Sequence, residues 1–217
     1  MSLYRMRIFL LNKVLFIVSL ALGVSSCISG KQKNIDIPKP YITHATNGLI
    51  YDATFQYKDF QASGLLVLKQ IEKSTYHVVL LSKFGPSIME FKMNEKGITW
   101  IKSMEKMDKK VVEKIIERDF RMILLTMLED PKKVKEINRN KEHLYYKVKK
   151  SLKVKAKIDP EAQRVLYAEN KSHLNIFKTK ATFTYGDHEI PENITLDHSH
   201  LKVNINLNLL KINNAER

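Results

Sequence analysis

The sequence predicts an α+β protein in which one antiparallel β-sheet is curled around helical segments. Three observations support this prediction. Short β-rich runs fill residues 49–101, apolar residues then recur with helical spacing up to residue 128, and a period of two returns from about residue 143. Short strands joined by tight turns are typical of an antiparallel meander. Because one face of such a sheet is apolar, a helix is expected to cover that face.

The first group of strands is rich in β-branched and aromatic residues. The predicted strands are 49–57, 63–71, 74–82, 87–93 and 98–101. Alternation is clearest in the fourth, where Met89, Phe91 and Met93 share one face while Glu90 and Lys92 share the other. The sequence therefore predicts that the three apolar residues point into the core.

A helix is predicted from Ser103 to Leu128, and Asp130-Pro131 is expected to stop it. Its apolar residues are Met104, Met107, Val111, Ile115, Ile116, Phe120, Ile123, Leu124 and Met127. Strands are predicted again from about His143. They include 152–158, 164–169, 173–179, 181–185 and a last strand, 201–209, whose odd-numbered residues are all apolar.

The N-terminus reads as a secretory signal. The apolar run at residues 14–23 is preceded by three basic residues, Arg5, Arg7 and Lys13. This run is shorter than the roughly 20 residues that are needed to span a bilayer. The following residues, Val24 to Cys27, resemble a bacterial lipobox. This resemblance implies that residues 1–26 are removed as a lipoprotein signal peptide and that the Cys27 thiol is lipidated.

Cys27 is the single cysteine of the 217-residue chain, so no disulfide competes with lipidation. Residue 28 is isoleucine rather than aspartate, which in such signals implies the outer membrane, here on its periplasmic face. Residues 27–47 are predicted to be the lipidated cysteine and a flexible tether, and residues 48–217 the folded domain. The net charge of +14 falls to +11 without Arg5, Arg7 and Lys13, and it favours anionic lipid or an acidic partner rather than nucleic acid.

Three stretches resemble the LolB family, the outer-membrane lipoprotein receptors related to the carrier LolA. They are Leu80–Trp100, Glu117–Pro131 and His188–Leu209. The resemblance implies an open antiparallel β half-barrel wrapped around a helical lid. It also implies a hydrophobic cavity that takes the acyl chains of lipoproteins, receives them from a LolA-type carrier and inserts them in the outer membrane. A monomer without a cofactor is expected.

The resemblance also implies two sets of site residues. Phe84, with Lys83, Gly85 and Pro86, would form a membrane-insertion loop, unless Phe84 folds back on the sheet. The apolar residues expected to line the cavity, or to pack a dry core, are Leu66, Leu68, Val79, Leu81, Met89, Phe91, Met93, Val111, Ile115, Phe120, Val203, Ile205 and Leu207.

Two further clusters have open interpretations. The lysines at 147, 149, 150, 153, 155 and 157 would lie on a hairpin, where they could dock an acidic carrier or anionic headgroups, or protect an edge strand from aggregation. His198 and His200, near His188, Asp187 and Asp197, are spaced for a metal but fall in a predicted polar turn, so no metal is expected.

No phosphate loop or nucleophile elbow appears, and the protein is not expected to be an enzyme. Two other functions stay open. One is a lipoprotein of the same fold that binds lipid or another hydrophobic ligand. The other is a structural or assembly protein with a closed core.

Overall fold

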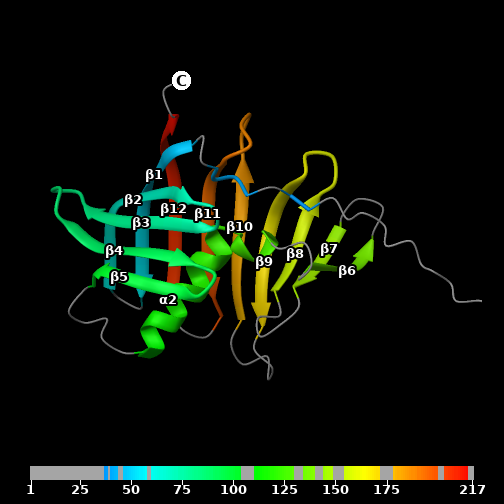
Figure 1. The fold of residues 1–217 in the computed structure, drawn as a ribbon, viewed down its shortest axis with the longest axis horizontal. Helices are drawn as coiled ribbons and strands as arrows, with labels where there is room; N and C mark the ends of the chain where they lie inside the picture. The colour runs from blue at the N-terminus through cyan, green and yellow to red at the C-terminus, as the bar shows by residue number, and fades with distance from the viewer. Residues whose placement is uncertain are drawn as a thin grey trace, which may run out of the picture. The chain divides into compact units, whose positions relative to one another are not determined.

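The computed structural model describes residues 37–38, 40–43, 46–57, 60–103, 110–129, 134–139, 144–148, 154–171, 178–199 and 203–214. Within these ranges the chain forms a twelve-stranded antiparallel sheet, one α-helix and one 3-10 turn (Figure 1). The predicted signal peptide and Cys27 lie outside the described residues. No helix in the described part is both long and apolar enough to cross a membrane.

The strands follow one another in a simple order. They are β1 (Thr46–Tyr57), β2 (Phe60–Glu72), β3 (Thr75–Ser82), β4 (Ser87–Asn94), β5 (Gly97–Lys102), β6 (Val134–Arg139), β7 (Leu144–Val148), β8 (Val154–Asp159), β9 (Arg164–Lys171), β10 (Lys178–Tyr185), β11 (Pro191–His198) and β12 (Val203–Asn214). Across the sheet they run β5-β4-β3-β2-β1-β12-β11-β10-β9-β8-β7-β6. The first and last strands therefore meet in the middle, while β5 and β6 are the two edges of an open sheet.

The open antiparallel sheet with a helix agrees with the predicted fold class, but several elements differ from the prediction. Residues 178–179 and 181–185, predicted to belong to two strands, lie in the single strand β10. Helix α2 (Lys110–Ile123) ends before residue 128, because Leu125 adopts a left-handed conformation (φ 55°) and a separate 3-10 turn, η2 (Thr126–Leu128), follows. Strand β6 precedes residue 143, where strands were expected to resume.

One face of the sheet carries a continuous apolar core. Met89, Leu80, Leu66 and Tyr51 are successive cross-strand partners from β4 to β1, and all are buried. On the other half of the sheet, Leu207, Ile194 and Phe183 are successive partners from β12 to β10, and Ala181 of β10 pairs with Ala168 of β9; all of them are buried. Helix α2 covers this face and contacts β5, β10 and β11 (Figure 1).

The folded domain begins earlier than predicted. Tyr41 and Ile42, placed in the tether by the sequence, are only 8% and 2% exposed. The Tyr41 hydroxyl also donates a buried hydrogen bond of 2.6 Å to the carbonyl oxygen of Ile123, at the end of α2. The prediction of a flexible tether up to residue 47 is therefore wrong for this segment, because two buried aromatic or aliphatic side chains outweigh its prolines and polar residues.

Gly64 of β2 is required by close packing of two strands. A Cβ atom there would lie 2.2 Å from the backbone carbonyl oxygen of Leu81 in β3. We expect Gly64→Ala to lower the free energy of unfolding in urea by about 1–3 kcal/mol, because the strands must move apart. Gly186→Ala is the matched control, since its Cβ would meet only the flexible carboxylate of Glu192, at 2.0 Å. Equal losses in both variants would contradict this explanation.

Candidate functional site: an apolar face, a pocket and an exposed loop

Most residues predicted to line a cavity share the inner face of the sheet or the helix side that covers it. Those that are buried there are Leu66, Leu68, Met89, Phe91, Met93, Phe120, Ile205 and Leu207. Ile115 and Val203 are half-buried, and the Val111 side chain lies outside the described residues. The structure thus brings side chains from β2, β4, β12 and α2 together on one apolar surface.

Val79 and Leu81 lie on the other face of the sheet. They alternate along β3 with the buried Val78 and Leu80, and Val79 pairs with Glu90 of β4. Their prediction as cavity residues is therefore corrected, because successive side chains of a strand point to opposite faces. In the run VVLL all four residues are apolar, so the sequence pattern does not say which pair faces the core.

Between β4 and α2 the apolar face is filled by aromatic rings. Phe91 lies edge-on to Phe120 with ring centroids 5.1 Å apart, and Trp100 of β5 contacts Phe91 at 5.1 Å. Such edge-to-face pairs stabilise a core beyond their burial alone. This part of the inner face is packed, so an acyl chain could enter it only if α2 moved away from the sheet.

Polar contacts hold α2 against the sheet from both sides. On one side, Nη2 of Arg121 donates to the carbonyl oxygens of Asn94 and Glu95 in the β4–β5 turn, at 2.9 and 3.3 Å. On the other, Nε2 of His198 in β11 lies 2.9 Å from a carboxylate oxygen of Asp119, and both side chains are almost fully buried. The helix is thus tied to strands that are far apart in the sheet.

His198 does not lie in a polar turn, as the sequence suggested, but is the buried last residue of β11. Its Nδ1 faces the carbonyl oxygen of Val203 at 3.3 Å, while His188 is exposed and His200 lies outside the described residues. The described residues contain no group of three or more acidic, histidine or cysteine side chains suited to a metal. His198 therefore has a structural role, because it contacts the buried carboxylate of Asp119.

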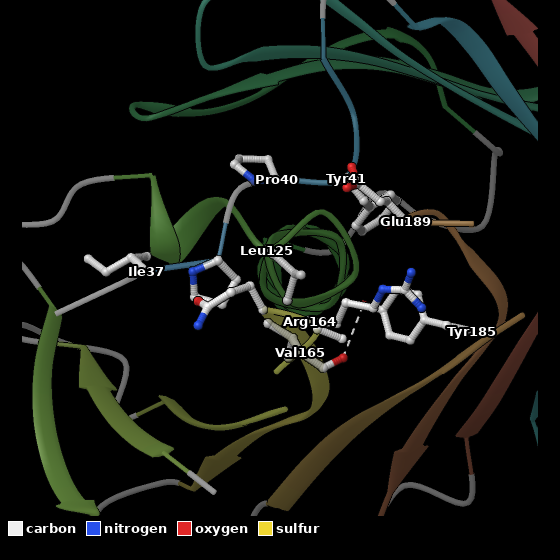
Figure 2. A pocket seen from close by; sticks show the side chains of 11 residues that line it. Ile37, Pro40, Tyr41, Leu125, Arg164, Val165, Tyr185 and Glu189 are labelled. Atoms are coloured by element: carbon white, nitrogen blue, oxygen red, sulfur yellow. Dashed lines mark hydrogen bonds between the residues drawn. The ribbon is translucent and has the colours of Figure 1, made fainter. Parts of the chain in front are cut away.

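A pocket of about 360 Å³ opens beside the C-terminal end of α2 (Figure 2). Its walls come from the N-terminal segment, Leu125, the β8–β9 turn and the ends of β9 and β10. The lining residues are Ile37, Pro38, Pro40, Tyr41, Leu125, Ala162, Gln163, Arg164, Val165, Tyr185 and Glu189. None of the predicted cavity residues is among them, and apolar side chains form much of the wall.

Arg164 is the cationic group of this pocket. Its guanidinium lies over the ring of Tyr185, with Cζ 5.2 Å from the ring centroid (Figure 2). The Tyr185 hydroxyl donates to the carbonyl oxygen of Val165 at 3.0 Å, which fixes the ring. Burial raises the pKa of Tyr185 well above its ordinary value of 10.0, although the Arg164 charge opposes this effect. The tyrosine is therefore neutral at physiological pH.

The predicted membrane loop joins β3 to β4. Phe84 at its tip is 95% exposed, and Lys83, Gly85 and Pro86 are exposed beside it. The loop is closed by hydrogen bonds from Ser82 N to Pro86 O (2.8 Å) and from Gly85 N to Ser82 O (3.0 Å), and Gly85 has a φ of 105°. Phe84 thus points away from the sheet on a short, hydrogen-bonded turn.

The lysine stripe is only partly described. Lys147 of β7 and Lys155 of β8 are directly opposite each other, and Lys157 pairs with Tyr145 and Tyr167. Lys149, Lys150 and Lys153 lie outside the described residues. Protection of an edge strand does not explain these lysines, because β6 lies outside β7 and β8 in the sheet.

Sequence reasoning missed the pocket and the Asp119–His198 pair. The pocket is built from residues within 37–41, Leu125 and residues within 162–189, so no local motif marks it. Asp119 interrupts the apolar face of the predicted helix between Ile116 and Phe120, and this buried acidic position was the available signal.

Three solved structures are similar to this chain, and one of them, with a TM-score above 0.5, supports the fold. A LolA superfamily protein from Nitrosomonas europaea matches with a TM-score of 0.55 and 8% identity, covering 81% of this chain and 89% of that chain. An outer-membrane lipoprotein-sorting protein domain from Vibrio parahaemolyticus, described as putative, has a TM-score of 0.48 and 11% identity, covering 77% and 84% of the two chains. A DUF1329 family protein from Desulfovibrio piger has a TM-score of 0.45 and 8% identity, covering 78% and 86%.

No family model matches the sequence, and no curated protein matches it. At 8% identity, the likeness to the LolA superfamily protein shows a shared fold and says nothing of the ligand.

Proposed function

We propose that this protein is a lipid-anchored envelope protein that binds acyl chains between α2 and the inner face of its sheet, once the helix moves away from that face, and delivers them to a membrane. Cys27 would carry the anchor, and the protein would face the periplasm from the outer membrane. The LolA-like fold and the continuous apolar face support this proposal. Sites for apolar ligands are concave and lined mainly by apolar groups, with few polar ones.

The exposure of Phe84 is the observation that carries the proposal. An aromatic side chain that is 95% exposed gains about 1.5–3 kcal/mol when it leaves water, which a membrane surface could supply. Lys83 beside it would meet anionic headgroups, worth about 1 kcal/mol for a basic residue at the surface. The loop would thus bring the domain to the bilayer that receives the ligand.

Lipoproteins are the first candidate ligand, received from a LolA-type carrier, because of the sequence resemblance to the LolB family. Free lipid is the second candidate. The charged Arg164 in the pocket favours it, since acyl chains joined to a protein by ester or amide bonds are uncharged at that end.

The test uses the full-length protein anchored in liposomes and a fluorescent lipoprotein in acylated and unacylated forms. We expect only the acylated form to bind. We also expect Phe84→Glu to slow its insertion into the bilayer about tenfold or more, with binding unchanged. Leu210→Glu is the matched control, because Leu210 is also an exposed apolar residue, at 59%, but lies on β12. Equal binding of both forms, or normal insertion by Phe84→Glu, would overturn the proposal.

A further inference from the structure

We propose that the pocket beside Arg164 selects amphiphiles whose apolar chain ends in an ionised carboxylate or phosphate. This inference rests on the proposed acyl-chain binding and specifies the chemical class of the ligand. The pocket has the mixed character that such a molecule needs, because Ile37, Leu125 and Val165 form apolar walls while Arg164 supplies one charge. Its volume of about 360 Å³ lies within the usual range for small-molecule sites, roughly 300–1,000 Å³.

The charge of Arg164 is not neutralised within the described part of the protein. No described carboxylate forms an ion pair with it, although Glu189 lines the same pocket. Its Nη1 donates one long hydrogen bond of 3.4 Å to the carbonyl oxygen of Gly186. Its Nε is buried, and no described residue accepts a hydrogen bond from it.

An incompletely paired guanidinium at a pocket wall is costly without a ligand. Buried donors in folded proteins are almost always hydrogen-bonded, and those that are not call for a bound ion, water or ligand. A carboxylate or phosphate would supply both a negative charge and two oxygen acceptors, which match the planar fork of the guanidinium. An alcohol or an ester would supply neither the charge nor the second charged oxygen.

The guanidinium is held ready for such a ligand. The Tyr185 ring makes a cation–π contact with it, and this ring is itself fixed by the hydrogen bond from its hydroxyl to the carbonyl oxygen of Val165. The preceding turn is rigid, because Asp159 Oδ1 accepts hydrogen bonds from the backbone amides of Glu161 and Ala162 at 2.9 and 3.2 Å. Little side-chain freedom is then lost on binding.

Glu189 is an acidic residue of the same pocket, so its removal can be compared with the removal of Arg164. Its exposed carboxylate lines the pocket and lies on the Tyr41 side of it (Figure 2). A negative charge near the binding site disfavours a negatively charged ligand, so removal of Glu189 should have the opposite effect to removal of Arg164.

The test measures the dissociation constants of octanoate, octyl phosphate and octanol by calorimetry, with the full-length protein in one nonionic detergent. We expect either anion to bind at least about tenfold more tightly than octanol, as for a charge-assisted hydrogen bond. Arg164→Gln should abolish this preference, and Glu189→Gln should increase it. Lys180→Gln should leave it unchanged, because Lys180 also stacks on a tyrosine, Tyr167 at 4.8 Å, but lies outside the pocket.

The relative affinities of octanoate and octyl phosphate indicate which class of natural ligand the pocket binds. Tighter binding of octanoate supports a free fatty acid, and tighter binding of octyl phosphate supports a lipid phosphate. If octanol binds as tightly as both anions, or if Arg164→Gln keeps the preference, the charge selection is overturned while acyl-chain binding stands. If none of the three compounds binds, acyl-chain binding in this pocket fails as well. Arg164→Lys keeps the charge without the fork and should retain part of the preference, which keeps the test decisive if Arg164→Gln does not fold.

Discussion

Replacing His198 by alanine is expected to lower the free energy of unfolding by about 3–5 kcal/mol, because it leaves the buried carboxylate of Asp119 without its main partner. The two side chains are only 2% and 4% exposed and lie 2.9 Å apart. The remaining cation near Asp119 is Arg118, whose Nε lies 3.4 Å from a carboxylate oxygen. Urea denaturation followed by circular dichroism measures the loss.

Two further variants separate the loss of the Asp119–His198 contact from a general effect of losing a histidine. His188→Ala removes an exposed histidine and should change the free energy of unfolding by less than about 0.5 kcal/mol. The double variant Asp119→Leu, His198→Leu should be more stable than His198→Ala alone, because no charge is left buried. A loss in His198→Ala no larger than in His188→Ala would show that the pair does not hold α2 on the sheet.

Replacing Phe120 by alanine is expected to lower the free energy of unfolding by about 3–5 kcal/mol through loss of buried surface and the cavity left behind. Phe120 is 2% exposed and packs edge-on against Phe91, which itself contacts Trp100. The same urea titration measures this loss, and the near-ultraviolet signal of Trp100 should weaken with it.

Phe84→Ala is the matched control for Phe120→Ala, since it removes the same side chain from a position that is 95% exposed. It should change stability by less than about 0.5 kcal/mol. A large loss in Phe84→Ala would mean that the residue supports the fold, and would weaken its proposed role at the membrane. A small loss in Phe120→Ala would mean that α2 is not part of the core.

Period-two patterns allowed the sheet to be predicted well wherever polar and apolar residues alternate. Met89, Phe91 and Met93 are buried as expected, and in the predicted strand 152–158 the alternate residues Val154, Ala156 and Ile158 are buried. Alternation fails as a guide when both faces of a strand are apolar, as in β3, and the face of Val79 and Leu81 was therefore predicted wrongly. It also fails for β6, whose sequence VKEINR is mostly polar.

The functional site was harder to predict than the fold. Phe84 could be singled out because an apolar residue between lysine and glycine is unusual in a loop. Arg164, Tyr185 and the segment around Tyr41 carry no shared motif, and only the folded chain brings them together. Burial of Tyr41 and Ile42 depends on contacts with the end of α2, which a local reading of a proline-containing segment does not reveal.

The pairing of β1 with β12 has a consequence for how the chain folds. Along this seam Thr46 lies opposite Asn214, so residues from the two ends of the domain must find each other across nearly its whole length. Strands β1–β5 form one chain of local hairpins and β6–β12 another, and each can form early. The two groups join only when β12 pairs with β1. Contacts between residues that are so far apart in the sequence slow folding. Before β12 pairs with it, the central strand β1 is a temporary edge with unpaired backbone groups, so the half-folded domain is open to edge-to-edge aggregation.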